Sequence, residues 1–228
     1  MRIIVIGANG NTGQEIVTQA LAAGHEVVGA VRRPETLSHI RGVEVAKIDL
    51  ADHASLVTAM DGADAVVSAL GHGGLKASAK FTTLYSDATR AIRAAMRETG
   101  ISRILVLSSG GTVDNDEAPG FYTKLIRRYL INTYLDMARM ETILEESPDL
   151  DWTSVRLTFL RDGPSKPFLV EDGTLSRGTF QIHFTDAARF VVEELAAGRW
   201  IKCHPVIGYD KGAKMREGAD NAAKLATA

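Results

Sequence analysis

The sequence predicts an α/β protein: a doubly wound, mainly parallel sheet with helices on both faces and a small irregular C-terminal region. Three observations carry this prediction. Apolar runs of strand length alternate with longer segments of helical period, and a glycine-rich turn joins the first run to the first helix. Near residue 160 Gly, Pro and short apolar pairs replace this alternation, which indicates turns and small strands.

Residues 2–31 are expected to form a strand, a helix and a second strand. The apolar run RIIVIG (2–7) suits a buried strand, and HEVVGAV (25–31) suits the next one. Residues 12–24 have helical period, and Gly24 stands where this helix would stop. The apolar face of the helix carries Ile16, Val17, Ala20 and Leu21.

The same alternation continues along the chain. Further strands are predicted at 43–50, 63–71, 102–111, 151–160 and 204–209. Further helices are predicted at 82–99, 124–146 and 186–197, the last of them capped by Thr185. The expected inward residues are Leu84, Ala88, Ala91, Ile92 and Ala95 in the first of these helices, and Ile126, Leu130, Met137 and Leu144 in the second.

The length and composition suit one compact domain. We expect it to span 1–210, with substrate-side elements at about 110–122 and 160–184, and a polar, Ala-rich tail at 211–228. A hydrophobic content of 45% and a charged content of 24% are typical of a globular protein with a real core. The net charge of -2 gives no electrostatic reason to expect nucleic acid or an anionic membrane as a partner.

Several other classes of protein are not expected. No apolar run approaches about 18 residues, and the N-terminus leads straight into the glycine turn, so we expect a cytoplasmic protein without a membrane segment. The single Cys203 excludes an intrachain disulfide and is expected to be an ordinary packed or surface residue. The histidines show no metal-ligand spacing with it, so no metal site is expected. Surface positions are expected for His72, Lys124, Arg127 and Arg128.

Three glycines, Gly7, Gly10 and Gly13, recur every third residue directly after the first strand, in GANGNTG. This spacing suits either a tight turn or a loop whose backbone approaches a pyrophosphate at the positive end of a helix. The loop follows a strand, opens a helix and lies within a strand–helix–strand unit of about 30 residues. This context favours the dinucleotide site.

The end of the second strand distinguishes between two nicotinamide cofactors. In a site for NAD, an acidic residue there accepts hydrogen bonds from the ribose 2′-hydroxyl. This chain has Ala30 and Val31, followed by Arg32 and Arg33. A guanidinium group offers a charge and a bidentate fork that suit a 2′-phosphate, although both arginines could also be simply solvated. The position favours NADP.

Six segments together indicate a family: GANGNTG, VRR, KIDLAD, GADAVVSALG, ISRILVLSSGG and LDWTSVRLT. Over residues 1–209 they resemble the atypical short-chain dehydrogenase/reductases of the NmrA-like NAD(P)-binding group, and within it the biliverdin and flavin reductases. The resemblance implies a Rossmann-like sheet with a nicotinamide cofactor across its carboxyl edge, where strand ends collect ligands.

The resemblance also implies a set of site residues. Ser109 is the candidate catalytic residue, and the alternative is that LSSGG is only a turn. The implied cofactor-binding residues are Gly7, Asn9, Gly10, Asn11, Thr12, Gly13, Arg32, Arg33, Asp49, Leu50, Ala69, Leu70, Gly71, Ser108, Thr158, Phe159 and Leu160. In this arrangement Asp49 and Leu50 border the adenine, and 69–71 pass beneath the ribose. Ser108 and Ser109 approach the nicotinamide, and 158–160 close over it.

One feature of the wider family is missing. Typical members use a Tyr and a Lys four residues later, but none of the five tyrosines here is followed by such a Lys. An isolated carbonyl needs a proton donor when it is reduced, whereas a flavin, quinone or linear tetrapyrrole spreads the added charge through its own rings. The sequence therefore favours reduction of such a conjugated small molecule.

A different function remains open. Some NmrA-like proteins are non-catalytic sensors of the NAD(P) balance, and the missing Tyr–Lys pair is compatible with that role as well. We expect an enzyme that acts on a small-molecule substrate, as a monomer or a weak homodimer, and keep the sensor as the alternative.

Overall fold

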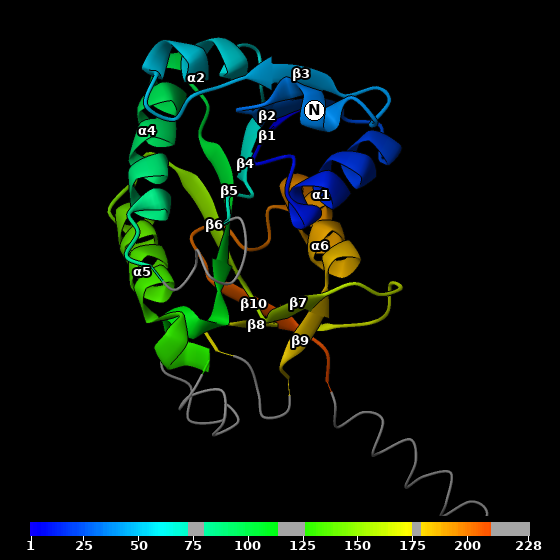
Figure 1. Ribbon diagram of the computed structural model, residues 1–228, viewed down its shortest axis with the longest axis vertical. Coiled ribbons are helices and arrows are strands. Elements are labelled where there is room, and N and C mark those ends of the chain that lie inside the picture. The colour runs from blue at the N-terminus through cyan, green and yellow to red at the C-terminus, as the bar shows by residue number, and fades with distance from the viewer. Residues whose placement is uncertain (73–79, 114–125, 175–178, 211–228) are drawn as a thin grey trace, which may run out of the picture.

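A computed structural model describes residues 1–72, 80–113, 126–174 and 179–210 (Figure 1). Its main sheet has eight strands in the order β3-β2-β1-β4-β5-β6-β10-β8. All neighbouring pairs from β3 to β10 are parallel, and only β8 runs antiparallel to its neighbour. The order of β1 to β6 is that of a Rossmann fold. The predicted fold class is confirmed.

The strands of the main sheet are β1 (Arg2–Ile6), β2 (Glu26–Val31), β3 (Glu44–Lys47), β4 (Ala65–Ser68), β5 (Arg103–Ser109), β6 (Asp151–Leu157), β8 (Leu169–Asp172) and β10 (Pro205–Gly208). The helices are α1 (Asn11–Ala22), α2 (His53–Met60), α4 (Leu84–Thr99), α5 (Ile131–Glu145) and α6 (Phe184–Ala197). Two short 3-10 helices are η1 (Pro34–Leu37) and η2 (Gly110–Thr112).

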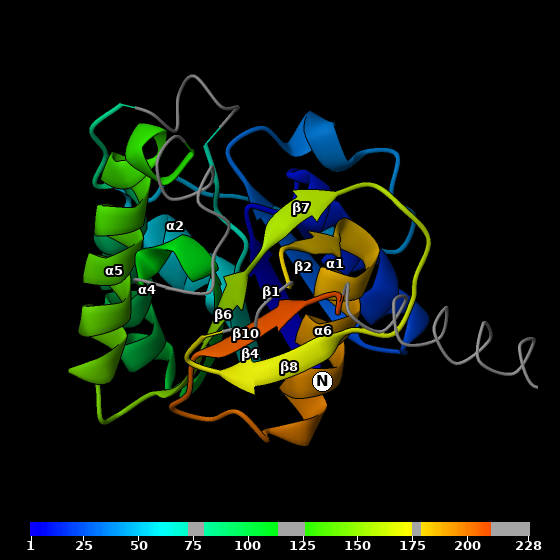
Figure 2. The same ribbon diagram turned by 90° about the horizontal axis from the view of Figure 1, so that it is seen from below.

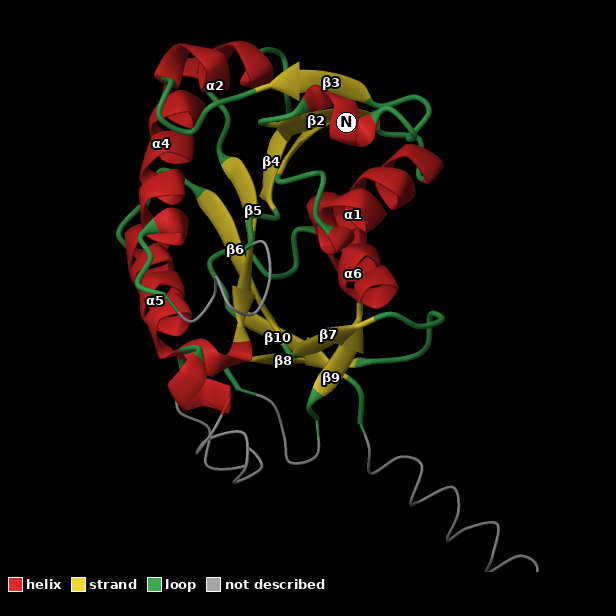
Figure 3. Ribbon diagram, viewed as in Figure 1, coloured by secondary structure: helices red, strands yellow, loops and turns green. Residues whose placement is uncertain are grey.

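Helices cover both faces of the main sheet (Figure 3). α1 packs against α6 on one face, and α2, α4 and α5 form a row on the other. Both faces of the central strand β1 are buried. Ile3 and Val5 belong to the core beneath α1 and α6, and Ile4 and Ile6 belong to the core on the opposite face. A parallel strand buried on both faces has this continuous apolar pattern.

The C-terminal region adds to the sheet and also forms a small sheet of its own. β7 (Phe159–Arg161) and β9 (Gln181–His183) pair in parallel as a separate two-stranded sheet. This pair lies beside β8 and β10 at one end of the molecule (Figures 1 and 2). The region predicted to be irregular is therefore partly an extension of the main sheet.

Several element boundaries differ from the predicted ones. Thr185 does not cap the last helix, because α6 begins at Phe184 with His183 as its N-cap and Thr185 lies within the first turn. The helix predicted from residue 124 begins as α5 at Ile131, and residues 124–125 lie outside the described part. The tail at 211–228 and most of the loop at 110–122 also lie outside it.

The buried face of α5 was predicted only in part, because Leu144 belongs to the core and Met137 packs against it. Of the residues expected to point inward, only Leu144 is fully buried, whereas Ile126, Leu130 and Met137 are half-buried. The buried residues of the helix are Thr133, Tyr134, Asp136, Met140, Glu141 and Leu144. Polar residues interrupt the apolar stripe of this face, so hydrophobic spacing alone does not mark it.

Candidate functional site

Two of the three loop glycines are required by internal packing. Gly7 has a φ of 81°, and a Cβ atom there would lie 2.7 Å from the carbonyl oxygen of Ala69. A Cβ atom on Gly13 would overlap the carbonyl oxygen of Gly7. Gly7 therefore allows the loop to pack closely against the end of β4, and Gly13 allows the start of α1 to pack closely against the loop.

Packing does not explain the third glycine. A Cβ atom on Gly10 would lie 3.5 Å from the carbonyl oxygen of Gly7, which is ordinary contact, and the φ of Gly10 is -76°. Gly10 is also the N-cap of α1, where no side chain accepts a hydrogen bond, and the first turn of α1 has no acidic residue. Together with exposed Asn9 and Asn11, this leaves a helix start open to an anionic ligand.

Two arginines follow directly after β2. Arg32 and Arg33 are exposed, and neither guanidinium group makes a hydrogen bond or ion pair with a described residue. Only the backbone carbonyl of Arg33 is engaged, because it accepts hydrogen bonds from Thr36. Both charges are therefore free to contact a ligand bound above the glycine loop.

The end of β3 leads into a tight turn before α2. Oδ1 of Asp49 accepts a hydrogen bond from the backbone amide of Ala51 at 3.0 Å, and the hydroxyl of Ser55 donates to the Asp49 carbonyl at 3.1 Å. Oδ2 of Asp49 makes no hydrogen bond with a described residue. Leu50 is half-buried against the core beneath α2 and α4. The turn is rigid and leaves one carboxylate oxygen accessible.

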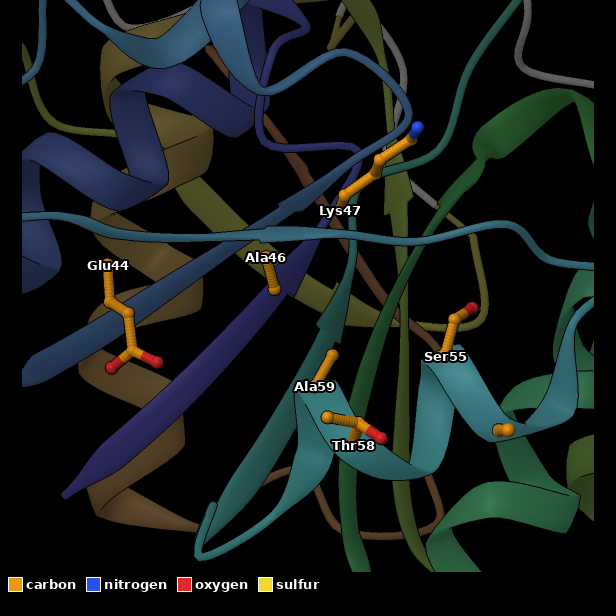
Figure 4. A pocket seen from close by; sticks show the side chains of 7 residues that line it. Glu44, Ala46, Lys47, Ser55, Thr58 and Ala59 are labelled. Carbon is orange, nitrogen blue, oxygen red and sulfur yellow. The ribbon is translucent and has the colours of Figure 1, made fainter.

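An open groove of about 380 Å³ runs between β3 and α2, outside this turn. β3 contributes Glu44, Ala46 and Lys47, whereas Ser55, Thr58 and Ala59 come from α2 (Figure 4). None of the predicted site residues lines it. The groove borders the carboxyl end of β3, because Lys47 ends that strand and Ser55 is hydrogen-bonded to Asp49.

Beyond β4 the chain runs alongside the glycine loop. The amide of Ala69 donates to the carbonyl of Ile6 at 2.8 Å, Leu70 is half-buried, and a Cβ atom on Gly71 would meet open space. Ala69 and Leu70 therefore lie directly against the glycine loop. Gly71, like Gly10, has no packing reason within the described residues to be glycine.

His72 corrects the expectation of an ordinary surface position. Its ring packs edge-on against buried Tyr85, with ring centroids 5.4 Å apart. Its Nε2 is buried and has no hydrogen-bond partner among the described residues. Burial lowers the pKa of this imidazole, against the opposing charge of Asp136, so the ring is neutral near neutral pH.

The two serines at the end of β5 differ in environment. The Ser109 hydroxyl accepts a hydrogen bond from the Gly111 amide at 3.2 Å and thereby caps η2. This is the structural role of a turn, yet the hydroxyl proton of Ser109 remains available to another acceptor. Ser108 is buried, and its hydroxyl makes no hydrogen bond of good geometry with a described residue.

A buried ionic cluster lies behind Ser108, and the sequence analysis did not identify it. Arg156 of β6 donates to both carboxylate oxygens of Glu141 in α5, at 3.0 and 2.9 Å. Burial alone would raise the pKa of Glu141. The nearby His204, whose Nδ1 lies 3.6 Å from Oε1 of Glu141, and the hydrogen bonds and charge of Arg156 outweigh that and lower the pKa to about 2. The one available signal was a charged residue, Arg156, between Val155 and Leu157 in a predicted strand.

Residues 158–160 leave β6 beside the serines. Leu157 is the register partner of Ser109, and the Thr158 hydroxyl donates to the Ile207 carbonyl at 2.9 Å. Phe159 then begins β7 with an exposed ring, and Leu160 packs against the core under α6. These residues follow the partner of Ser109 directly, at the same edge of the sheet.

The residues predicted to form the site thus follow the ends of β1 to β6 at one edge of the parallel sheet. Among the described residues, His72 Nε2, after β4, is a buried polar atom without a hydrogen-bond partner, whereas the buried hydroxyl of Ser108, at the end of neighbouring β5, interacts with Glu141. With the open start of α1 and the unneutralised Arg32, this donor set fits a ligand that carries phosphates at one end and a polar ring at the other.

Other classes of site find no support in the described ranges. No group of His, Cys, Asp and Glu there could hold a metal ion, and no helix there is long and apolar enough to cross a membrane. Cys203 is half-buried, its thiol donates to the Ile201 carbonyl, and burial raises its pKa. It is a packed residue, not an activated nucleophile.

Comparison with protein families supports the same interpretation. A family model described as NAD(P)H-binding matches residues 7–197. An uncharacterized protein of Mycobacterium tuberculosis is 36% identical over 111 residues, which are 48% of this chain and 12% of that protein. An isoflavone reductase homolog of Zea mays is 25% identical over 199 residues, 78% of this chain and 62% of that protein. The chain thus spans only part of these curated relatives.

Solved structures share the fold over almost the whole chain. A candidate exported protein of Burkholderia pseudomallei superposes with a TM-score of 0.76 and 26% identity, over 92% of this chain and all of the other. A candidate NADH-flavin reductase of Streptococcus pneumoniae superposes with a TM-score of 0.73 and 24% identity, over 92% of this chain and 99% of the other. At this identity the second likeness establishes the architecture alone.

Proposed function

The chain belongs to the NAD(P)H-binding family of Rossmann-fold proteins, and from this premise we propose that it is an NADPH-dependent reductase of conjugated acceptors such as flavins, quinones or linear tetrapyrroles. The observation that carries the proposal is the start of α1. Among the described residues, Gly10 has no packing reason to be glycine, and the first amides of the helix have no side-chain acceptor. A bound pyrophosphate would explain both features, because it needs close approach of the backbone at Gly10 and accepts hydrogen bonds from the free helix amides.

NADPH is preferred to NADH because of the residues after β2. No carboxylate stands there to accept a hydrogen bond from a ribose hydroxyl, whereas Arg32 and Arg33 offer two unneutralised guanidinium groups. A 2′-phosphate suits them in charge and geometry. Asp49 and Leu50 border the adenine, and 69–71 carry the ribose past the glycine loop.

At the other end of the cofactor, the protein orients the reactants. Bound NADPH supplies the hydride. Ser109 directs its free hydroxyl proton toward the reacting rings, and 158–160 exclude water from one side. No tyrosine is followed four residues later by a lysine, and burial raises the pKa of Tyr85 to about 12. The acceptor must therefore delocalise the added charge itself, which conjugated rings do.

The decisive experiment is NADPH oxidation, followed by absorbance, with FMN, a quinone and dichlorophenolindophenol as acceptors. We expect turnover with at least one of them. Ser109→Ala should lower that turnover by about ten- to a hundredfold, with unchanged affinity for NADPH, because a positioned hydroxyl acts on the chemical step. NADPH binding without turnover on any acceptor would favour a redox sensor instead.

A further inference from the structure

Within this proposed function, we infer that Phe159 and Arg161 of β7 form the acceptor half of the site and select a planar acceptor that carries a negative charge. The inference rests on their position, on the exposed ring of Phe159 and on the unneutralised charge of Arg161.

The position follows from the strand register. Ser109 of β5 pairs with Leu157 of β6, and Phe159 stands two residues further along the chain. At about 3.3 Å per residue, it lies about 7 Å beyond the partner of Ser109. The hydrogen bond from Thr158 to the Ile207 carbonyl fixes the connection between the two strands. Phe159 is thus held close to the candidate catalytic serine.

Phe159 presents a flat apolar surface. Its residue is 39% exposed, an unusual arrangement for a large aromatic group at the edge of a core. The ring is nearly parallel to that of Phe180, with an interplanar angle of 3° and centroids 6.0 Å apart. Leu160, the next residue, packs against the core, so strand alternation places Phe159 and Arg161 together on the opposite face.

Arg161 adds a charge above this surface. Its guanidinium carbon lies 5.3 Å from the centroid of the Phe159 ring. Arg161 is exposed and forms no hydrogen bond or ion pair with a described residue. Arg189 provides a contrast: it lies over the Phe168 ring at 4.9 Å, but its charge is neutralised by Asp186 at 2.9 Å. The charge of Arg161 is available to a ligand.

Together these two residues match a specific ligand chemistry. A planar conjugated ring gains area and quadrupolar attraction by packing against the part of the Phe159 ring that Phe180 and Arg161 leave exposed. A phosphate or carboxylate on the same molecule can accept charge-assisted hydrogen bonds from Arg161. The acceptor is therefore a flat heteroaromatic anion, and a neutral ring of the same shape should bind less well.

FMN and riboflavin test this directly, because they share one ring system and differ by a phosphate. Binding is measured by quenching of flavin fluorescence on the protein saturated with NADP⁺, which cannot reduce the flavin. We expect the wild type to bind FMN about three- to tenfold more tightly than riboflavin. Arg161→Gln should abolish this difference by weakening FMN alone, and Phe159→Leu should weaken both flavins.

Arg90→Gln is the control, because it removes another exposed arginine, one that pairs with Asp87 in α4, and should leave both affinities unchanged. Equal FMN and riboflavin binding in the wild type, an unaltered ratio in Arg161→Gln, or no binding of either flavin would overturn the inference. Turnover measured in parallel keeps it distinct from the proposed function. Arg161-dependent FMN binding without NADPH oxidation supports this ligand site and contradicts the reductase.

Discussion

At the scale of single residues, the loop after β1 separates structural glycines from a functional one. Gly7 and Gly13 face backbone atoms that leave no room for a Cβ atom, so any protein with this turn needs them. Gly10 faces no such obstacle. The sequence places all three at equal spacing, and only the three-dimensional contacts distinguish their roles.

Alanine substitutions should separate these roles experimentally. Gly13→Ala forces a methyl group onto the backbone of Gly7 and should destabilise the fold by about 1–3 kcal/mol or more. Gly10→Ala should leave stability within about 0.5 kcal/mol of wild type and weaken NADPH tenfold or more. Thermal unfolding of the free protein and an NADPH titration measure the two effects. Wild-type affinity in Gly10→Ala would mean that the loop is only a turn.

The arginines after β2 carry a second prediction at this scale. A charge-assisted contact with the 2′-phosphate should contribute about 1.5–3 kcal/mol, which is roughly a ten- to hundredfold preference for NADPH over NADH. Arg32→Ala should lose much of that preference by weakening NADPH alone, and the double variant with Arg33→Ala should lose more. Titration of both cofactors at fixed salt measures it. Equal affinities in the wild type would contradict the NADP assignment.

At the scale of elements, α4 and α5 depend on each other. The N-cap of α4, Thr83, provides no side-chain hydrogen bond to the helix start. Instead Asp136, fully buried in α5, accepts hydrogen bonds from the Tyr85 amide at 2.8 Å and the Ser86 hydroxyl at 2.6 Å. One helix therefore caps the other.

Asp136→Ala should consequently destabilise the protein by about 2–4 kcal/mol, because it leaves a buried helix amide and a hydroxyl without acceptors. Urea unfolding measures the change. Asp87→Ala in α4 removes an exposed carboxylate and should cost less than about 0.5 kcal/mol. A similar small cost for Asp136→Ala would show that other groups cap α4.

These elements also show what could be predicted from the sequence. β1, β2 and α4 were predictable because their apolar spacing is uninterrupted, and Gly24 does stop α1 with a φ of 81°. α2 was not predicted: it has eight residues, and its signal is the Asp52 cap, whose carboxylate accepts from the Ala54 amide. Short helices bury too few apolar residues to show a period.

In the candidate site, too, features defined by local sequence could be predicted, whereas features that depend on tertiary contacts could not. The glycine loop and Arg32 could be identified because local order along the chain fixes their place in a strand–helix–strand unit. The Glu141–Arg156 pair could not, because its partners meet only through the packing of α5 on β6. The burial of His72 likewise depends on Tyr85, which belongs to a different element.

At the scale of the whole molecule, the buried ion pair of Glu141 and Arg156 makes the free energy of unfolding depend on pH. The pKa of Glu141 falls from 4.5 to about 2 on folding, so this group stabilises the fold fully above about pH 4.5. As the pH falls through this range, the unfolded chain takes up a proton that the folded protein still excludes. The contribution, on the order of 3 kcal/mol, is then lost.

Glu141→Gln should reveal this by a change of slope. Near neutral pH the variant should be less stable, because Arg156 stays buried without its anion. Between about pH 4.5 and 2, however, it should lose less stability than the wild type. Urea unfolding at several pH values measures both. Parallel pH profiles would show that Glu141 is not the group responsible.

The strand order has a consequence for synthesis on the ribosome. β8 pairs only with β10, which stands between β8 and β6 although it follows both in the chain. During synthesis, Leu169–Asp172 therefore emerge before the strand with which they pair. The outer edge of β6 also lacks its partner until β10 has been made. A nascent chain that stalls before Pro205 lacks the bridge between these two strands. It exposes two unpaired edges at once, each a template for pairing with a neighbouring nascent chain.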